Sequence, residues 1–386
     1  MWRSIASNAL TLFIVILIAL GAAIGWGKSQ YSAAGPLETA ICVRVAPGSN
    51  MSAVSADLET QGAVTSGRIF RIGANYSDKS SKLKAGSFLV PEGASMEQIV
   101  DIVTRGGAST CGTEIVYRIG VTRSTVQVRE LDPASNRFVE TASFNSATDE
   151  TPEEYNTVKA AADTRFRIAL AEGVTSWQIV EALKGIDVME GDVIAVPAEG
   201  RLAPDSYEIS VGDDRGDLIA LMEARQTERL EEAWRNRAEG LPYETPDEAL
   251  IMASIVEKET GNSDEAGLVA SVFVNRLNKD DRLQTDPTVI YGITKGEGVL
   301  GRGLRQSELR RETPYNTYVI KGLPPTPIAN PGLKSIEAAL NPPDTDFYFF
   351  VAKTLDPRDG HNFSVDYAQH QKFVEEYRKL EAARDN

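Results

Sequence analysis

The feature that most constrains this chain is an uncharged apolar run close to its N-terminus. Residues 5–26 read IASNALTLFIVILIALGAAIGW and contain no charged side chain. At about 1.5 Å of helical rise per residue, this run spans the roughly 30 Å hydrocarbon core of a bilayer. We therefore expect a transmembrane anchor, with residues 1–4 in the cytoplasm and the globular part outside it. A cleaved signal peptide is the alternative, because Ser32 to Gly35 offers small residues for cleavage.

Charge and composition exclude several classes of protein for the rest of the chain. The 386 residues include 40 Lys and Arg against 55 Asp and Glu, which gives a formal net charge of −15. A chain this acidic is poorly suited to hold nucleic acid by its phosphates, so no nucleic-acid partner is expected. Cys42 and Cys111 are too few for a disulfide-dense scaffold or a four-cysteine zinc site. In an oxidising compartment they are able to pair; the alternative is two free thiols.

A short pattern occurs three times along the chain. Each copy has an apolar strand, a turn with glycine, a Ser, Thr or Asn that begins a helix, and apolar residues at helical spacing. The copies begin at Val43, Leu89 and Ile168. Such units either bind extended polymers or simply build a small α+β domain, and the pattern leaves both open. Between the second and third copies, the run TEIVYRIGVTRSTVQVREL at 113–131 alternates like strands, and a turn at 132–136 and a polar loop at 146–154 follow it.

One helix in the C-terminal half of the chain places a carboxyl group among apolar side chains. We expect this helix to begin at Pro246 and to end before Gly261. Glu259 lies seven residues after Met252 and on the same apolar face, whereas Glu257 points elsewhere. Burial and the negative end of the helix dipole are both expected to raise the pKa of Glu259. A carboxyl protonated near neutral pH suits a general acid in glycosidic cleavage; the alternative is a solvent-facing or Arg-paired side chain.

Amide, hydroxyl and phenol groups recur in the proline- and glycine-rich loops that follow this helix. They suit neutral sugars, because amides hydrogen-bond hydroxyls and tyrosine rings cover sugar C–H surfaces. The candidate cleft residues are Asn275, Gln284, Asp286, Tyr291, Tyr315 and Asn316. Each has a structural alternative, such as a cap or, for Asp286, an Asx turn before Pro287. His361 and His370 lack an evident third ligand, so neither a metal nor a cofactor is expected.

Five blocks of sequence resemble the YceG-like endolytic murein transglycosylase family in order and spacing. They are ASIVEKET at 253–260, VFVNRL at 272–277, LQTDPT at 283–288, YNTY at 315–318 and GLPP at 322–325. The resemblance implies an α+β chain with an N-terminal transmembrane helix, LysM-like α/β subdomains and a lysozyme-like catalytic domain. The implied parts are a tail at 1–4, an anchor at 5–26, a linker at 27–40, a LysM-like subdomain at 41–107, a β-rich insertion at 108–167, a second strand–helix unit with a connecting helix at 168–240, and the catalytic domain at 241–386.

The resemblance also implies an activity, a location and partners. Family members cut the MurNAc–GlcNAc β-1,4 bond within nascent peptidoglycan strands without water, leave 1,6-anhydro-MurNAc ends, and so terminate glycan elongation. The implied location is the inner membrane, crossed once, with the globular part in the periplasm. The implied partners are glycan strands and the peptidoglycan synthases known as penicillin-binding proteins.

The ASIVEKET block contains two acids, and we predict that Glu259 is the catalytic one. In related lysozyme-like enzymes the catalytic Glu precedes a Ser or Thr at a helix end, which Glu259 does and Glu257 does not. The same carboxyl is expected to protonate the leaving oxygen and then to accept the proton of the MurNAc C6 hydroxyl. Two alternatives stay open: a non-catalytic glycan-binding scaffold, and a hydrolase in which Asp286 faces Glu259 at about 6.5–9.5 Å.

Overall fold

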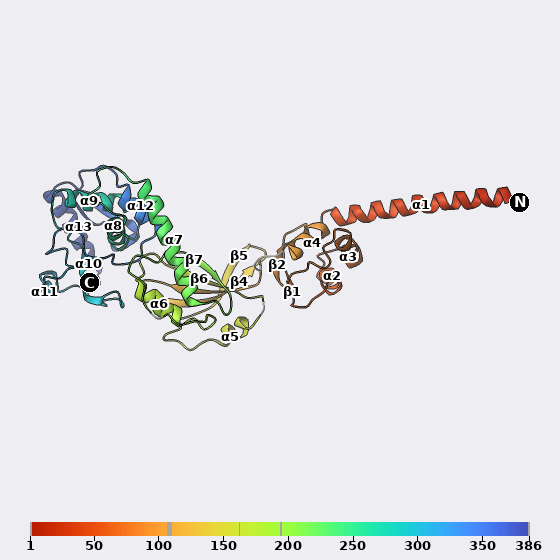
Figure 1. Ribbon diagram of the computed structural model, residues 1–386, viewed down its shortest axis with the longest axis horizontal. Helices are drawn as coiled ribbons and strands as arrows, with labels where there is room; N and C mark the ends of the chain where they lie inside the picture. Colours follow the sequence, from red (N-terminus) through yellow and green to blue (C-terminus); the bar gives the residue numbers. More distant parts are fainter. Residues whose placement is uncertain (1, 106–109, 162, 194, 385–386) are drawn as a thin grey trace. The chain divides into compact units, whose positions relative to one another are not determined.

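The computed structural model of the protein describes residues 2–105, 110–161, 163–193 and 195–384, with side chains from residue 10 onward. Its elements are a mixture of helices and strands, so the predicted α+β class is confirmed (Figure 1). The chain divides into two compact units. The first is built mainly from residues up to Val116 with parts of 127–166, and the second mainly from Arg167 onward.

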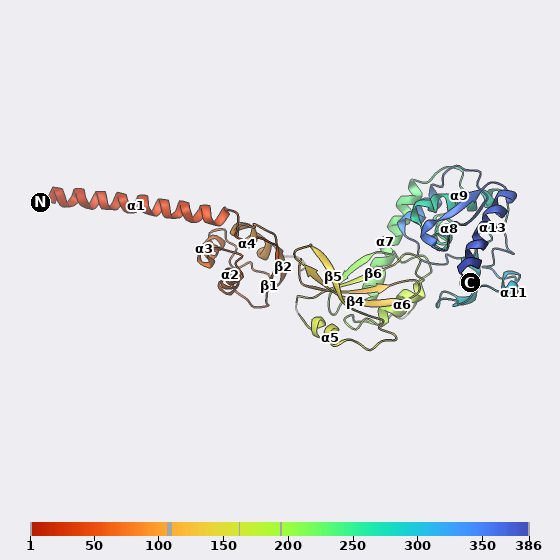
Figure 2. The same ribbon diagram turned by 180° about the vertical axis from the view of Figure 1, so that it is seen from behind.

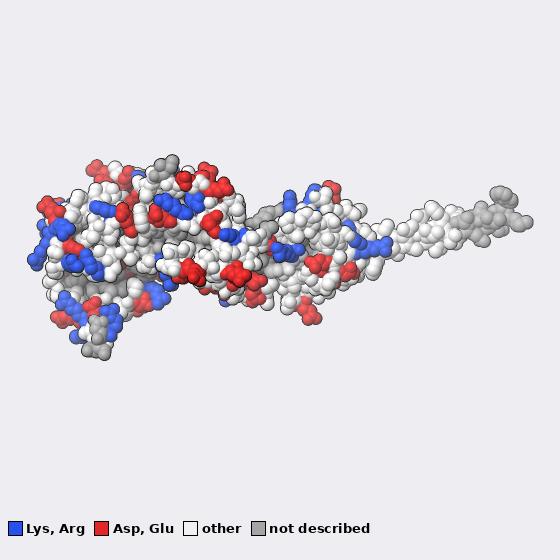
Figure 3. All heavy atoms as spheres, turned by 90° about the horizontal axis from the view of Figure 1, so that it is seen from below, with Lys and Arg blue, Asp and Glu red and all other residues white. Residues whose placement is uncertain are grey.

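A single long helix, α1 (Trp2–Ser32), begins the chain. It contains a stretch, Leu10–Ser32, that is long and apolar enough to cross a membrane. The helix is longer than the predicted anchor, because no proline interrupts the chain before Pro36. The first part of the predicted linker is therefore helical. In the space-filling view, the part of α1 that is not grey shows no Lys, Arg, Asp or Glu until the helix joins the rest of the first unit (Figure 3).

The small body that follows α1 has a two-stranded sheet and three helices. Strand β1 (Ile41–Val45) pairs antiparallel with β2 (Gly86–Val90), with Ile41 opposite Val90. The helices are α2 (Met51–Thr60), α3 (Gly67–Tyr76) and α4 (Met96–Thr104), of which α3 and α4 contact α1 (Figures 1 and 2). Their core contains fully buried side chains such as Leu58, Phe70 and Ile99. Cys42 and Cys111 form a disulfide, so the paired alternative is confirmed.

The three copies of the repeated pattern form as predicted. The turn glycines Gly48, Gly93 and Gly173 all have a positive φ, of 79°, 64° and 77°, which a glycine adopts at little steric cost. Each helix then begins with a side-chain cap, from Asn50 in α2, Ser95 in α4 and Thr175 in α6 (Ser176–Lys184). The sequence identified these helix starts because both the glycine and the cap are local signals.

The alternating stretch after the second copy belongs to a five-stranded sheet. Its strands are β3 (Thr113–Ile119), β4 (Ser124–Asp132), β5 (Arg137–Phe144), β6 (Arg165–Leu170) and β7 (Ser206–Ile209), in the order β5-β4-β3-β6-β7. Helix α5 (Glu153–Lys159) lies between β5 and β6 in the chain. The strands from 113–144 thus share a sheet with the strand of the third copy.

The C-terminal part of the second unit is mostly helical. Its elements are α7 (Arg215–Arg235), α8 (Pro246–Glu259), α9 (Ala266–Asn278), α10 (Asp286–Thr294), α11 (Gln306–Leu309), α12 (Leu333–Leu340), β8 (Phe349–Ala352), β9 (His361–Ser364) and α13 (Tyr367–Arg384). Strand β8 pairs antiparallel with β9, and α13 contacts both.

Helix α8 is the centre of this part. Thr245 caps it through a capping box, as its start predicted. The expectation of one apolar face is wrong, because every residue from Ala249 to Val256 is buried. The helix contacts α7, α9, α10 and α12, which leave no solvent face along its middle. Its charged residues are therefore confined to the two ends.

Candidate active site

The proposed acid, Glu259, is the last residue of α8 and is only partly exposed. The Thr285 hydroxyl donates a hydrogen bond to its Oε1 atom. Thr285 is 1% exposed and precedes the first residue of α10. The C-terminal end of α8 and the N-terminal end of α10 therefore meet at this carboxyl.

The surroundings of Glu259 favour its protonated form. Burial raises the pKa of the Glu259 carboxyl to about 7, and the negative charge of Asp286 acts in the same direction. The hydrogen bond from Thr285 and the positive charge of Arg276 oppose the increase. A carboxyl that titrates near neutral pH is able to donate a proton and then to accept one.

Two buried threonines, Thr288 and Thr317, hold the main chain of Thr285 in place. The Thr285 N–H donates to Thr317 Oγ1 at 3.1 Å, and the Thr288 hydroxyl donates to the Thr285 carbonyl at 2.8 Å. The hydroxyls of Thr288 and Thr317 lie 2.9 Å apart. All three residues are at most 1% exposed. This network holds the main chain from which the Thr285 hydroxyl reaches Glu259.

The residues on either side of Thr285 point to solvent. Gln284 is exposed and has a φ of 53°, in the left-handed region that side chains other than glycine rarely adopt. Asp286 is also exposed, and its Oδ1 atom accepts a hydrogen bond of 2.7 Å from the Tyr318 hydroxyl. Two predicted site residues, Gln284 and Asp286, are thus within one residue of the group that contacts Glu259.

Two other predicted site residues, Tyr291 and Tyr315, form a second cluster beside α10. Their ring centroids are 5.2 Å apart, and the Tyr315 and Thr326 hydroxyls are 2.8 Å apart. The Tyr291 hydroxyl donates to Glu199 Oε2 at 3.2 Å. Burial raises the pKa of Glu199, although hydrogen bonds from Ser176 and Tyr291 lower it. Each ring is partly exposed, so each keeps some surface for a ligand.

The two predicted asparagines hold main-chain segments in place. Asn275 Nδ2 donates to the carbonyls of Thr345 and Phe347 at 2.7 and 2.9 Å. Asn316 is fully buried, and its Nδ2 donates to three carbonyls of the 308–311 segment. Its Oδ1 accepts the N–H of Tyr318. Both amides therefore have partners within the protein, which favours the structural alternative for these two residues.

The second acid of the block, Glu257, lies in a different environment from Glu259. Its Oε2 atom accepts the N–H of Gly332, at the start of α12, at 3.0 Å. Burial raises the pKa of this carboxyl, and the hydrogen bond from Gly332 lowers it. The residue between the acids, Lys258, donates to the carbonyl of Gly173 at 3.2 Å. The three charged residues at the end of α8 therefore face three different neighbours.

A buried polar cluster follows Glu259 directly in the chain. The Thr260 hydroxyl donates to Glu265 Oε1 at 2.7 Å, and the His361 N–H donates to Glu265 Oε2 at 2.8 Å. The His361 ring also contacts Glu265, with Nδ1 at 2.5 Å from Oε1. His361 thus joins β9 to the segment after α8, whereas His370 stacks on Phe349 with ring centroids 5.2 Å apart. The ring nitrogen of His361 thus has a protein partner, whereas the buried Nδ1 atom of His370 has no hydrogen-bond partner among the residues that the structure describes.

The structure adds three residues to the predicted site: Thr285, Tyr318 and Arg276. Thr285 contacts Glu259, Tyr318 contacts Asp286, and the charge of Arg276 acts on Glu259. The signal in the sequence is the Thr-Asp-Pro order at 285–287, which is typical of a helix start. This order predicts the start of α10, but it does not predict that the C-terminal end of α8 lies against that start.

This arrangement defines a class of site: one partly buried carboxyl, titrating near neutral pH, held between two helix ends. The YceG-like family profile matches residues 125–376, and the chain belongs to this family. The resemblance seen in the sequence is thereby confirmed.

Two relatives and one solved structure are similar to the chain. The endolytic murein transglycosylase of Bacillus subtilis is 29% identical over 87% of this chain and 85% of its own length. The endolytic murein transglycosylase of Streptococcus pneumoniae is 26% identical over 81% of this chain. The alignment covers 54% of that protein, so the chain spans about half of its length. A crystal structure of a YceG-like protein from Listeria monocytogenes is 24% identical, with a TM-score of 0.46 over 87% of this chain and 99% of that one.

Proposed function

We propose that the protein is an endolytic murein transglycosylase, a lyase that cuts the MurNAc–GlcNAc β-1,4 bond inside nascent glycan strands and leaves 1,6-anhydro-MurNAc ends. Membership of the YceG-like family and the names of both relatives support this activity. The observation that carries the mechanism is the Glu259 carboxyl, whose pKa burial raises to about 7.

In this proposal a single carboxyl performs both proton transfers. Protonated Glu259 gives its proton to the glycosidic oxygen as the bond to the anomeric carbon breaks. The resulting carboxylate then takes the proton of the MurNAc C6 hydroxyl, whose oxygen bonds to the anomeric carbon of the same sugar. Glu259 returns to its protonated form, and no water is consumed. A pKa near 7 suits both proton transfers, because at neutral pH the carboxyl is accessible in its protonated form and in its ionised form.

We assign the neighbouring residues different tasks in this reaction. Thr285 orients the acid, because its hydroxyl donates to Glu259 and its main chain is held by two buried threonines. Gln284 and Asp286 bind the glycan beside the acid, since both are exposed. Tyr291 and Tyr315 cover a sugar ring farther along α10. Asn275 and Asn316 position loops and do not contact the sugar.

The domain organisation and location follow from the same proposal. Helix α1 anchors the protein in the inner membrane, with the body in the periplasm. The β1–α4 body is the LysM-like subdomain at 41–107, residues 108–240 connect it, and residues 241–386 form the lysozyme-like catalytic domain. As a terminase of glycan elongation, the enzyme acts near penicillin-binding proteins, which supply the nascent strands.

The ends of the product strands test the activity. Purified glycan-rich murein is incubated with the full-length protein in detergent, and the fragments are identified by mass spectrometry. The proposal expects internal cuts that create 1,6-anhydro-MurNAc ends. Reducing MurNAc ends would instead identify a hydrolase, with Asp286 as the candidate base. Intact strands bound to the protein would identify a glycan-binding scaffold.

A further inference from the structure

We infer that helix α3 lies on the surface of the membrane that α1 crosses, with Arg68, Ile72 and Tyr76 in the lipid headgroup layer. These three residues form a stripe along one face of α3, and this stripe gives the protein a second membrane contact beside its anchor. The inference requires α1 to span a bilayer, but it does not depend on the reaction at Glu259.

The outer face of α3 exposes apolar side chains that the fold of the first unit does not use. Ile72 is 59% exposed and Tyr76 is 93% exposed. On the opposite face of the same helix, Phe70 and Ala74 are fully buried in the core. Arg68, Ile72 and Tyr76 follow one another at intervals of four residues, so they share one face of the helix. An amphipathic helix with an aromatic and a basic residue beside exposed apolar surface is typical of membrane interfaces.

The contact between α3 and α1 sets the depth of this stripe. Gly73 of α3 packs so closely on the ring of Tyr31 that a side chain at residue 73 would collide with it. Tyr31 is five residues beyond Trp26, which ends the apolar run, or about 7.5 Å farther along the helix axis. The headgroup layer is roughly 5–8 Å thick on each side of the hydrocarbon core. Helix α3 therefore meets α1 at the depth of the lipid headgroups.

The orientation of α3 turns the stripe away from the core of the first unit. At about 100° per residue, Tyr76 is about 60° and Ile72 about 100° around the helix from Gly73. Phe70 is about 60° from Gly73 in the opposite sense. In the ribbon diagrams, α3 occupies the end of the small body that α1 enters (Figures 1 and 2). Two faces of α3 flank its contact with α1. One carries Phe70 and is buried in the core, and the other carries Ile72 and Tyr76.

The charge of α3 fits an anionic lipid surface. The helix contains Arg68 and Arg71 and no acidic residue, although the chain as a whole has a net charge of −15. Lys28, three residues before Tyr31 in α1, is exposed. Basic side chains are also visible where α1 joins the body (Figure 3). On α4, which also contacts α1, Asp101 is paired with Lys79, while Glu97 is exposed. Basic side chains near a membrane surface are attracted to anionic headgroups.

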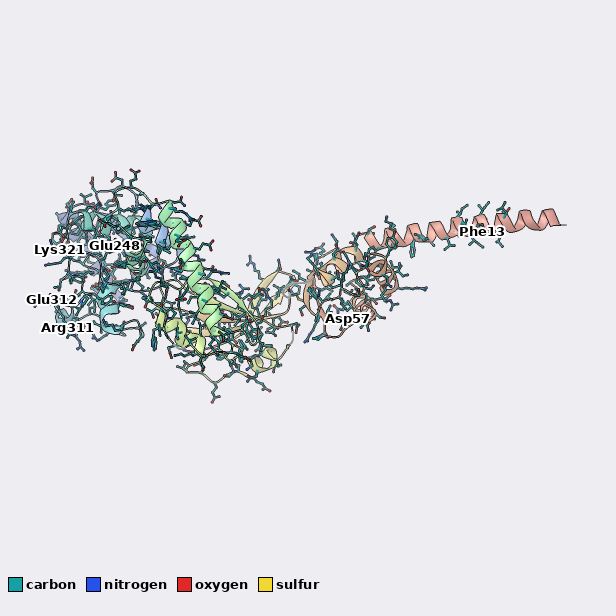
Figure 4. The ribbon with its side chains drawn as sticks, viewed as in Figure 1. Phe13, Asp57, Glu248, Arg311, Glu312 and Lys321 are labelled. Atoms are coloured by element: carbon teal, nitrogen blue, oxygen red, sulfur yellow. A yellow bond between two sulfur atoms is a disulfide. The ribbon has the colours of Figure 1, made fainter. Side chains whose placement is uncertain are left out.

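Site-specific fluorescent labels test this arrangement in the full-length protein. Single-cysteine variants I72C and Y76C, with the native disulfide intact, receive an environment-sensitive thiol label. They are then reconstituted in vesicles of phosphatidylcholine and phosphatidylglycerol. The matched control is V139C, since Val139 is 52% exposed on β5 and so resembles Ile72 in exposure. F13C reports the insertion of α1, from which Phe13 projects (Figure 4).

The inference expects labels at 72 and 76 to be quenched by lipid-attached nitroxides. It also expects their quenching by aqueous iodide to be at least about threefold weaker than at 139. If F13C is protected while I72C and Y76C match V139C, α3 does not touch the membrane and the inference is wrong. It is equally wrong if iodide is excluded but lipid nitroxides do not quench, because a protein surface, such as a second copy of the chain, then covers the stripe.

Discussion

The Thr285 hydroxyl donates a hydrogen bond to the Glu259 carboxyl, so a residue 26 positions farther along the chain orients the proposed acid. Thr285 has this role because Thr288 and Thr317 hydrogen-bond its main chain and hold it in place. The site therefore depends on how the start of α10 meets the end of α8. The Thr285–Glu259 contact and the charge of Asp286 affect the pKa of Glu259 in opposite directions, which makes the proposal testable by pH dependence.

Replacing Thr285 with Val removes the donor and keeps the side-chain volume. This hydrogen bond lowers the pKa of Glu259, so its loss moves the alkaline limb of the pH–rate profile to higher pH. The rate at the optimum is expected to fall about tenfold, because a hydrogen bond to a charged group contributes roughly 1.5 kcal/mol. Thr104→Val is the matched control, since that hydroxyl donates to the Val100 carbonyl within α4 and belongs to no part of the proposed site. An alkaline limb that stays in place in Thr285→Val would argue against the orienting role.

Replacing Asp286 with Asn is expected to move the alkaline limb of the pH–rate profile to lower pH. The charge of Asp286 raises the pKa of Glu259, so the neutral amide lets Glu259 ionise at lower pH. Asn keeps an acceptor for the Tyr318 hydroxyl. The variant is expected to keep forming anhydro ends, with a loss of less than about tenfold at the optimum. Complete loss of strand cleavage would instead indicate that Asp286 is an obligatory base, as in a hydrolase.

The raised pKa of Glu259 also predicts how stability depends on pH. In the unfolded chain this carboxyl ionises near pH 4.5, whereas in the folded protein it stays protonated up to about pH 7. The folded state therefore binds more protons in this window, and stability falls as the pH rises through it. Relative to Glu259→Gln, the wild-type protein is expected to lose about 2–3 kcal/mol between pH 4.5 and 8.

Chemical unfolding of both proteins across this pH range measures that difference. The control is Glu312→Gln, which removes an exposed carboxyl outside the site (Figure 4). A constant difference between wild type and Glu259→Gln at all pH values would contradict a shifted pKa.

Replacing Gln284 with Gly separates stability from activity. The left-handed backbone at Gln284 costs about 1 kcal/mol for a residue other than glycine, so the variant is expected to be more stable by up to that amount. Its activity is expected to fall, with KM rising about tenfold, because an exposed glycan contact is lost. Asn136→Gly in the β4–β5 turn, with a φ of 52°, relieves the same backbone conformation by a smaller amount, because Asn adopts it more readily than Gln, and is expected to leave activity unchanged. Full activity in Gln284→Gly would remove Gln284 from the glycan-binding residues.

Local signals account for the parts of the fold that the sequence predicted correctly. The turn glycine Gly93 lies two residues before the cap at Ser95, and Thr245 directly precedes Pro246 at the start of α8. Such signals fix where a helix begins. They do not reveal that α8 is enclosed on all sides, because its neighbours α7, α9 and α12 come from three separate stretches of chain.

The candidate site follows the same division. Glu259 is predicted as the acid from its helical phase and from the Thr that follows it, both of which the sequence alone contains. The separate environments of Glu257 and Glu259 depend on Gly332 and Thr285, which are distant along the chain. The asparagines at 275 and 316 resemble sugar-binding residues in the sequence, but their amides bond to carbonyls that only the folded loops bring near.

The most direct test of the account compares Glu259→Gln with Glu257→Gln. Both replacements remove a partly buried carboxyl and keep its shape, and circular dichroism confirms that each variant is folded. Release of anhydro-MurNAc ends from murein is expected to fall at least about a thousandfold in Glu259→Gln and less than about tenfold in Glu257→Gln. If Glu257→Gln abolishes those products while Glu259→Gln retains them, the assignment of the acid is contradicted.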